Sequence, residues 1–478
     1  MITTSTENYP LFVGGEWIDS GEQDAVRLPY DGSPIATLPL ADEKLLSRAV
    51  SAAREGAKAM AAMANYERAD LLDRIREGVR QNADEFTRLL WSETGKPIKE
   101  ARVEVDRCQQ TLLAASIEAR QLHGEVVPMD FAPMGKGRMA MTVREPLGIV
   151  AAITPFNVPL NLALHKVAPA LAAGNAVIHK PAERTPLSAL RLARVIADAG
   201  APKGAYNVLH GSGPKLGAAM LADAHIDMLT FTGSARVGEE IRSKAGLKRI
   251  TLELGNNSAV VVEPDCDRET AIARTVQGAF GNSGQVCISV QRVYVHSSIA
   301  QSFVEQLKAA TEKLKIGHPR EESTDISSLI DEAAAKRVEE WIQEALGSGA
   351  KAVTGGARRY ATIPPTILTN VPASARISCQ EVFGPVVAVY PYDKLDDAIA
   401  QVNNTPYGLQ AGIFTNDLQR AFQSARKFRV GGVLINDVPM WRADHMPYGG
   451  VKHSGIGREG PRYAMEEMTD LKLICWKA

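Results

Sequence analysis

Three side chains of the sequence offer the chemistry of covalent catalysis. Cys287 ends the glycine-rich segment 281–287; its thiolate is a strong nucleophile, and the glycines allow close backbone approach and free N–H groups for an oxyanion. Glu253 lies within the apolar, strand-like run 251–255, where a raised pKa suits a carboxyl group to act as a general base on water. Asn157 lies between two prolines and can donate its amide to an oxyanion. The alternatives are a core cysteine, a strand-end glutamate facing solvent and an asparagine in an ordinary turn.

A second group of residues is suited to a phosphate-containing ligand. Phe231-Thr-Gly-Ser234, followed by Gly238, comes after a strand-like segment and opens a helix-like one. The N–H groups at such a helix start can hold a pyrophosphate, although the full GxGxxG spacing is absent. Lys180 and Glu183 follow another strand-like segment. That is where a doubly wound sheet presents ligand-binding residues, and the alternative is a pair of solvated charges.

The elements that must position these residues alternate between strands and helices. Short apolar runs, each followed by a helical segment, predict strands at 149–153, 176–178, 205–209 and 228–230. A second alternating region predicts strands at 258–262, 292–296 and 386–390 and helices at 299–314 and 331–346. We therefore expect an α/β fold with two domains, each built on a parallel sheet.

The remaining segments predict the parts that surround the two domains. The first 40 residues contain short β-like pieces, and 41–122 has helical spacing of Ala, Leu, Glu and Arg. Residues 126–143 predict a β-hairpin with little core of its own, a shape that packs on a neighbouring chain.

Composition excludes several classes of function. The chain has 478 residues, 45% hydrophobic and 23% charged, with a formal net charge of −1, so no general electrostatic attraction to nucleic acid or an anionic membrane is expected. No apolar run is long enough for a transmembrane helix, and no signal peptide is evident. Five scattered cysteines without CxxC spacing argue against disulfides and a zinc site. The expectation is a cytoplasmic protein with reduced thiols and no metal.

Taken together, the motifs resemble those of the NAD(P)-dependent aldehyde dehydrogenase superfamily. The similarity runs from segment 12–17 to segment 466–469. The most specific motifs are Pro155-Phe-Asn157, Lys180-Pro-Ala-Glu183, Phe231-Thr-Gly-Ser234, Leu252-Glu-Leu-Gly255, Gly284-Gln-Val-Cys287, Glu381-Val-Phe-Gly-Pro385 and residues 447–455. One departure is Gly255-Asn-Asn257, where many members have a second glycine.

The resemblance implies the role of each reactive group. Cys287 would attack an aldehyde to form a thiohemiacetal, whose oxyanion Asn157 and the Cys287 N–H would hold. Hydride transfer would leave a thioester, which water activated by Glu253 would hydrolyse to a carboxylic acid. The alternatives are a CoA-acylating semialdehyde dehydrogenase, which commonly lacks the base at Glu253, and a non-catalytic protein of this fold, which has no reason to keep all three groups.

The resemblance also implies how the chain is divided and how it binds its cofactor. An NAD-binding domain would comprise 1–122 and 144–254, a catalytic domain 255–445, an oligomerisation arm 123–143 and 470–478, and a return segment 446–469. The arm implies a homodimer or a homotetramer. The implied cofactor residues are Thr154, Pro155, Lys180, Glu183, Gly213, Phe231, Gly233, Ser234, Val237, Leu254, Glu381 and Phe383. Because Glu183 can bind both ribose hydroxyls and would repel a 2′-phosphate, NAD is expected in preference to NADP, which Lys180 would still tolerate.

The resemblance also implies which residues line the substrate pocket, and their side chains indicate the kind of aldehyde that binds. Its implied lining is Val158, Leu162, His165, Val286, Ile288, Trp441 and Arg442. Because arginine binds carboxylate, phosphonate, sulfonate or phosphate through two donors, Arg442 with His165 indicates a small anionic or polyhydroxylated aldehyde. The alternative is that Arg442 pairs with Asp444 and that His165 only packs. The loop 441–448 is similar to that of lactaldehyde, glyceraldehyde-3-phosphate and phosphonoacetaldehyde dehydrogenases.

Overall fold

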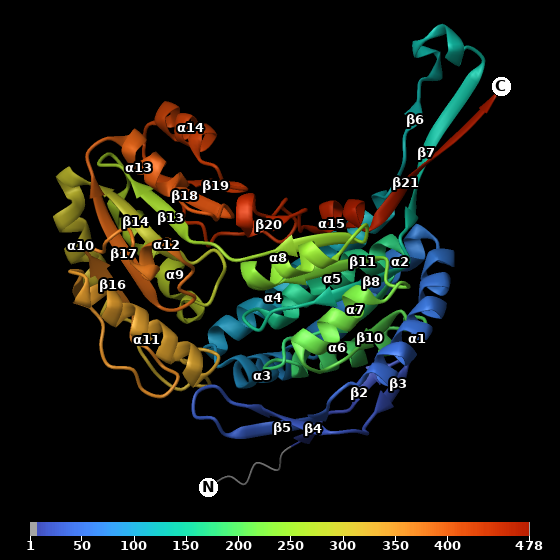
Figure 1. Ribbon diagram of the computed structural model, residues 1–478, viewed down its shortest axis with the longest axis horizontal. Coiled ribbons are helices and arrows are strands. Elements are labelled where there is room, and N and C mark those ends of the chain that lie inside the picture. Colours follow the sequence, from blue (N-terminus) through green and yellow to red (C-terminus); the bar gives the residue numbers. More distant parts are fainter. Residues whose placement is uncertain (1–6, 478) are drawn as a thin grey trace.

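The computed structural model describes residues 7–477 and contains two lobes and a projecting arm (Figure 1). Residues 1–6 and 478, which the sequence assigned to the first domain and to the arm, lie outside the described residues. The first lobe is built on an eight-stranded sheet in the order β20-β12-β11-β8-β9-β10-β2-β3. Its strands are β2 (Leu11–Val13), β3 (Glu16–Ile18), β8 (Ile149–Ile153), β9 (Ala176–Lys180), β10 (Tyr206–Val208), β11 (Met228–Thr232), β12 (Arg249–Glu253) and β20 (Gly455–Ile456).

The five strands β8 to β12 are parallel and buried between two layers of helices. Alternate residues of β8 point to opposite faces: Val150 and Ala152 pack against α2, α4, α5 and α6, whereas Ile149 and Ala151 pack against α1, α7 and α8. This double burial explains the unbroken apolar runs of the sequence. The helices are α1 (Glu43–Ala62), α2 (Asn65–Gln81), α3 (Ala83–Thr94), α4 (Ile98–Gln121), α5 (Pro159–Ala173), α6 (Leu187–Asp198), the π-turn Gly213–Gly217, α7 (Ala218–Ala222), α8 (Ala235–Lys244) and α15 (Pro461–Glu467).

The second lobe is built on a seven-stranded sheet in the order β15-β16-β17-β14-β13-β18-β19. All its strands are parallel except β15 at one edge. The strands are β13 (Ser258–Val262), β14 (Val290–His296), β15 (Lys351–Thr354), β16 (Thr366–Thr369), β17 (Val386–Tyr392), β18 (Gln410–Phe414) and β19 (Gly432–Ile435). The helices are α9 (Arg268–Phe280), α10 (Ser297–Thr311), α11 (Glu332–Gly347), α12 (Arg376–Cys379), α13 (Leu395–Asn403) and α14 (Leu418–Lys427).

The arm is a three-stranded antiparallel sheet in which two strands from residues 126–146 pair with the last strand of the chain (Figure 1). Strand β7 (Arg138–Pro146) lies between β6 (Val126–Val127) and β21 (Thr469–Lys477), and it pairs with β21 from Thr469–Pro146 to Lys477–Arg138. Short 3₁₀ turns at Met129–Phe131 and Pro133–Gly135 form its tip. A smaller sheet of β1 (Glu7–Asn8), β5 (Pro34–Pro39) and β4 (Gln23–Arg27) lies on the opposite side of the molecule.

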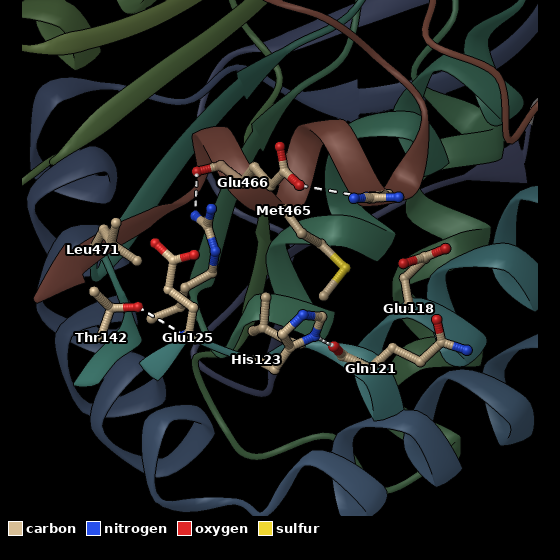
Figure 2. A pocket seen from close by; sticks show the side chains of 12 residues that line it. Glu118, Gln121, His123, Glu125, Thr142, Met465, Glu466 and Leu471 are labelled. Atoms are coloured by element: carbon tan, nitrogen blue, oxygen red, sulfur yellow. Dashed lines mark hydrogen bonds and ion pairs between the residues drawn. The ribbon is translucent and has the colours of Figure 1, made fainter. Parts of the chain in front are cut away.

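A cavity of about 320 Å³ lies where the arm joins the first lobe (Figure 2). In it Arg144 of β7 donates to the backbone oxygen of Glu466 at 3.4 Å and to Oγ1 of Thr469 at 3.1 Å. The backbone N–H of Glu125 donates to Oγ1 of Thr142 at 2.9 Å. The Arg144 bonds anchor β7 to α15 and to the start of β21, and the Glu125 bond holds the start of the arm to β7.

This architecture confirms the predicted fold class, two α/β units with parallel sheets and a β arm. The division of the chain into domains at the stated boundaries stays a prediction. Among residues 7–477, no helix is both long and apolar enough to cross a membrane.

Candidate active site

A bend in the backbone brings Cys287 to the interface between the lobes. Helix α9 ends at Phe280, and the 3₁₀ turn Gly281–Gly284 follows, with Asn282 and Ser283 in the left-handed region at φ 49° and 53°. These conformations are costly for residues other than glycine. Two side chains hold them: the Asn282 N–H donates to Oε1 of Glu100 at 2.9 Å, and Oγ of Ser283 donates to the backbone oxygen of Ser327 at 3.0 Å.

The Cys287 thiol is partly exposed and has a single hydrogen-bond partner among the described residues. Its Sγ lies 3.0 Å from the hydroxyl of Tyr448. Burial of its surroundings raises the pKa of Cys287 to about 12, and the Tyr448 hydrogen bond works in the opposite direction. The sequence analysis did not identify Tyr448, although it lies in the motif 447–455.

Asn157 is placed beside this loop by the turn between β8 and α5. Its Nδ2 donates to the backbone oxygen of Gln285 at 2.9 Å. Its own backbone oxygen accepts a 2.7 Å hydrogen bond from Nζ of Lys96, which forms a buried ion pair with Glu104. Within residues 7–477, the Cys287 N–H has no partner. It therefore remains free to join Asn157 in holding an oxyanion.

Glu253 lies at the end of β12 and is only 5% exposed. The alternative of a solvent-facing strand end is therefore wrong. Its Oε2 is buried without a hydrogen-bond partner. Burial, together with the negative charge of Glu459, raises its pKa well above the usual carboxyl range, and Lys166 and Arg442 only partly oppose this. A carboxyl group in this state fits a general base.

A cluster of charged side chains lies next to the reactive groups. We call it the charge cluster; it consists of Arg107, His165, Lys166, Arg442, Asp444 and Glu459. Glu459 accepts from Nζ of Lys166 and from Nη2 of Arg442, each at 3.0 Å. The Arg442 guanidinium stacks 3.7 Å from the centroid of the Tyr448 ring. Through Arg442 the charge cluster contacts the Tyr448 ring, and the Tyr448 hydroxyl in turn contacts Cys287.

The structure corrects the alternative in which Arg442 pairs with Asp444. Asp444 instead forms a two-pronged ion pair with Arg107 of α4, at 2.7 and 3.1 Å, and accepts from Nε2 of His165 at 3.0 Å. Burial and Arg442 lower the pKa of His165, so the ring is neutral at pH 7. Burial alone would lower the pKa of Arg442. The negative charge of Glu459 and the other neighbours of Arg442 more than offset this, so the pKa of Arg442 is raised. Lys166 and Glu459 carried no signal in the sequence that singled them out.

The other predicted pocket residues lie around the same point. Val158 precedes α5, and Leu162 and His165 lie on its first turns. Val286 and Ile288 flank Cys287, and Ile288 packs with Tyr448 in a small apolar cluster. Trp441 is 46% exposed, and the Arg442 side chain beside it is 6% exposed.

The predicted cofactor residues follow the carboxyl ends of four neighbouring parallel strands. Thr154 and Pro155 follow β8, Lys180 ends β9, Gly213 comes after β10, and Phe231 lies in β11, the positions at which open α/β sheets bind ligands. Exposed Ser234 caps the N-terminus of α8, its Oγ accepting from the Val237 N–H at 3.4 Å. A Cβ at Gly233 would lie 2.4 Å from the end of the Phe231 ring, so any larger residue there would displace that ring.

The remaining cofactor residues are Glu183 after β9, Leu254 after β12, and Glu381 and Phe383 of the second lobe. Exposed Glu183 accepts from the Gly213 N–H at 2.6 Å. Leu254 packs against Gly238 of α8. Glu381 accepts from the Asn256 N–H at 2.9 Å, and Phe383 contacts Phe156 edge-to-face at 5.7 Å. The exposed N–H groups at the start of α8, the Glu183 carboxylate and the second-lobe residues Glu381 and Phe383 together fit a bound dinucleotide.

A partly exposed thiol near a side-chain amide, a buried carboxyl group and a dinucleotide-type sheet edge together form the arrangement expected of covalent aldehyde chemistry. The model of the aldehyde dehydrogenase family matches residues 17–474, and the chain belongs to this family. It is 50% identical over 471 residues to the 3-sulfolactaldehyde dehydrogenase of Priestia megaterium, covering 98% of both chains.

Two solved structures are similar over nearly the whole chain. Aldehyde dehydrogenase 21 from Physcomitrella patens, in complex with the reaction product succinate, matches with a TM-score of 0.97 at 40% identity, covering 99% of both chains. Glyceraldehyde-3-phosphate dehydrogenase GapN from Methanocaldococcus jannaschii, complexed with NADP, matches with a TM-score of 0.92 at 38% identity, covering 96% of this chain and 100% of that one. The expectation of an aldehyde dehydrogenase is confirmed.

Proposed function

We propose that this chain oxidises a small anionic aldehyde to its carboxylic acid with NAD as the preferred oxidant. The Cys287 thiolate forms a bond to the aldehyde carbon, and the carbonyl electrons move to oxygen, which the Asn157 amide and the Cys287 N–H hold. A nicotinamide cofactor held by the residues at the carboxyl ends of β8 to β11 would supply the acceptor for the hydride of this carbon. Glu253 then removes a proton from water as the water attacks the thioester carbon, and the carbon–sulfur bond breaks to release the acid. An intact Glu253 disfavours transfer to CoA.

Arg442 is the observation that carries the choice of an anionic substrate. Its guanidinium is buried, lies against the tyrosine that contacts Cys287, and has an Nε without a partner. With His165 neutral, the three cationic side chains of the charge cluster outnumber its two carboxylates. One excess positive charge at a buried site favours one negative charge on the ligand.

The three relatives support this choice, because the names of all three point to compounds with an acidic group. Priestia megaterium's enzyme is named for 3-sulfolactaldehyde, the Physcomitrella structure holds succinate, and the archaeal enzyme is named for glyceraldehyde 3-phosphate. A sulfonate-bearing hydroxyaldehyde heads the proposed substrates because that relative is 50% identical.

The test compares kcat/KM for three-carbon aldehydes bearing sulfonate, phosphate, carboxylate or no charge. Replacement of Arg442 with Met is expected to lower kcat/KM for the preferred anionic aldehyde about 10- to 100-fold more than for neutral lactaldehyde, since a hydrogen bond to a charged group is lost. Arg80→Met, which removes an exposed ion pair with Glu77 on α2, is the control and should change neither value. An equal loss for both aldehydes would refute the anion-binding role.

The preference for NAD rests on Glu183, whose exposed carboxylate lies at the cofactor edge of the sheet. Glu183→Gln removes the charge that repels a 2′-phosphate. The ratio of kcat/KM for NADP to that for NAD should therefore rise about tenfold or more, whereas Glu240→Gln, on the exposed face of α8, should leave it unchanged. If the wild-type enzyme already prefers NADP, the proposed cofactor preference is wrong.

We further propose that the arm joins copies of this chain into a dimer or a dimer of dimers. Strand β21 pairs on one side only, and β19 forms the open edge of the second sheet. Large apolar side chains are exposed along the arm, among them Phe131, Met134, Leu471 and Leu473. A cytoplasmic location stays a prediction; it is compatible with five cysteines that are all free thiols.

A further inference from the structure

The nucleophilic sulfur and one phenol form an isolated polar pair. Within residues 7–477, Tyr448 is the only hydrogen-bond partner of the Cys287 Sγ, at 3.0 Å, and Cys287 is the only partner of the Tyr448 hydroxyl. Tyr448 is 2% exposed and packs with Ile288 and Leu409. Water therefore does not compete readily for this hydroxyl.

The Tyr448 ring is held in place from two sides. Its backbone forms an antiparallel bridge with Glu459, with N–H to oxygen distances of 3.0 and 2.6 Å. The Arg442 guanidinium lies on the ring face at 3.7 Å from the centroid, and Glu459 fixes that guanidinium by an ion pair. One residue, Glu459, thus positions both the backbone and the stacking partner of Tyr448.

We propose that Tyr448 is a further catalytic residue, whose hydroxyl donates a hydrogen bond to the Cys287 thiolate and so keeps the nucleophile available. A thiol can either donate or accept in this pair, but a thiolate can only accept, so the bond favours the charged form. When the sulfur lone pair forms the bond to the aldehyde carbon, Tyr448 keeps its proton and releases the sulfur.

The titration behaviour of both groups agrees with this role. Burial raises the pKa of Tyr448 well above its usual value, so the phenol retains its proton at neutral pH. Burial also raises the pKa of Cys287, and the Tyr448 hydrogen bond is the largest opposing influence. Arg442 lowers the pKa of Cys287 as well, and the nearby carboxylates Glu381 and Glu253 raise it.

The inference rests on the proposed function, in which Cys287 is the nucleophile. The test is the pH dependence of Cys287 alkylation by iodoacetamide in the full-length enzyme, with the modified residue identified by mass spectrometry. Tyr448→Phe removes only the hydroxyl. At each pH between about 7 and 9 the alkylation rate should fall about tenfold, which corresponds to an upward shift of about one unit in the pKa of the Cys287 thiol. Tyr463→Phe, on α15, removes a phenol hydroxyl that has no hydrogen-bond partner among the described residues; it is the matched control and should keep the wild-type profile.

The outcomes separate the two proposals. An unshifted profile in folded Tyr448→Phe, with Cys287 still modified, would overturn the role of Tyr448 and leave the nucleophile in place. Failure of iodoacetamide to modify Cys287 in the wild type, or full activity after modification, would overturn the proposed function itself. Should Tyr448→Phe fold poorly, Tyr448→Met fills the same apolar site and makes the same prediction.

Discussion

Glu253 is the residue proposed as the base, and its buried position in the folded protein is energetically unfavourable. Its carboxyl group is buried at the end of β12, and one of its oxygens has no partner. A buried polar group without a partner destabilises the folded state. Under the proposed mechanism, the site therefore trades stability for a base that can take a proton from water.

Replacing Glu253 with Gln should slow steady-state turnover about 10²- to 10⁴-fold, because water loses its base. The first turnover forms NADH before water is needed, so rapid-mixing measurements should still show a burst of NADH close to the enzyme concentration. Loss of the burst together with turnover would contradict a role limited to hydrolysis.

The same substitution should stabilise the protein, and the gain should grow with pH. Below the ordinary carboxyl pKa, both the folded and the unfolded states carry a protonated Glu253, and the group has no pH-dependent effect. Above it, the unfolded state ionises while the raised pKa keeps the folded state protonated, so wild-type stability falls by about 1.4 kcal/mol per pH unit until the folded pKa is reached. Thermal melts should show a larger increase in Tm for Glu253→Gln at pH 8 than at pH 5; an equal or smaller increase would refute this linkage.

Among the elements, the start of α4 supports both loops that carry the reactive groups. Lys96 donates to the backbone oxygen of Asn157, and Glu100 accepts from the Asn282 N–H. Glu104, one turn further, neutralises Lys96 and also accepts from the Leu160 N–H at 2.9 Å, at the first turn of α5. Lys96, two residues before α4, and Glu100 and Glu104 in its first turns thus fix the distance between Asn157 and the Cys287 loop.

Lys96→Met should therefore affect both folding and catalysis. It leaves Glu104 charged and buried, which costs about 3–5 kcal/mol, and it frees the Asn157 backbone, so kcat should fall more than KM rises. Lys99, three residues after Lys96, forms a partly exposed ion pair with Asp325. Lys99→Met breaks this pair, and we expect a cost of about 1 kcal/mol or less. Denaturation midpoints and steady-state kinetics of the two variants check this; similar losses in both would argue against a special role for Lys96.

The elements also show which features a sequence can predict. Strands 149–153 and 258–262 match the structure because their apolar runs are buried on both faces. The helix expected at 331–346 begins at Glu332 because the Asp331 side chain accepts from the Ala334 N–H and caps it. Two-residue β20 was not predicted, because only its pairing with β12 makes it a strand.

The residues of the candidate site also divide into those with a local sequence signal and those placed by long-range pairing. Cys287, Glu253 and Asn157 lie in short motifs with local signals, and the structure brings their loops together. Glu459 was missed because it reaches the site through a backbone bridge to Tyr448, eleven positions earlier in the chain, and its ion pair with Lys166 joins α5 to the C-terminal segment. Such long-range pairings leave no pattern in neighbouring residues.

At the scale of the whole molecule, the arm is the part least able to bury its own surface. Leu473 on β21 is 56% exposed, and Phe131 at the tip is 96% exposed. Burial of such side chains against a second copy is favourable by about 25 cal/mol per Å² of apolar surface. The arm is thus expected to be the main source of association energy.

Leu473→Asp should shift the enzyme toward monomers, because it places a charge on the surface that another copy would cover. Light scattering coupled to size-exclusion chromatography measures the mass directly. Ile316→Asp, at an equally apolar position that is 47% exposed in the body of the molecule, is the control. A wild-type mass that is already monomeric, or a Leu473→Asp mass equal to that of an oligomeric wild type, would contradict the proposal.

The position of β21 has a practical consequence for anyone who labels or immobilises this enzyme. The strand runs to Lys477, so almost any fusion added after it would extend directly from the arm. The sheet that contains β1 lies on the other side of the molecule (Figure 1). A fluorescent protein or affinity tag joined at the C-terminus should therefore interfere with assembly, whereas the same tag joined at the N-terminus should leave assembly intact.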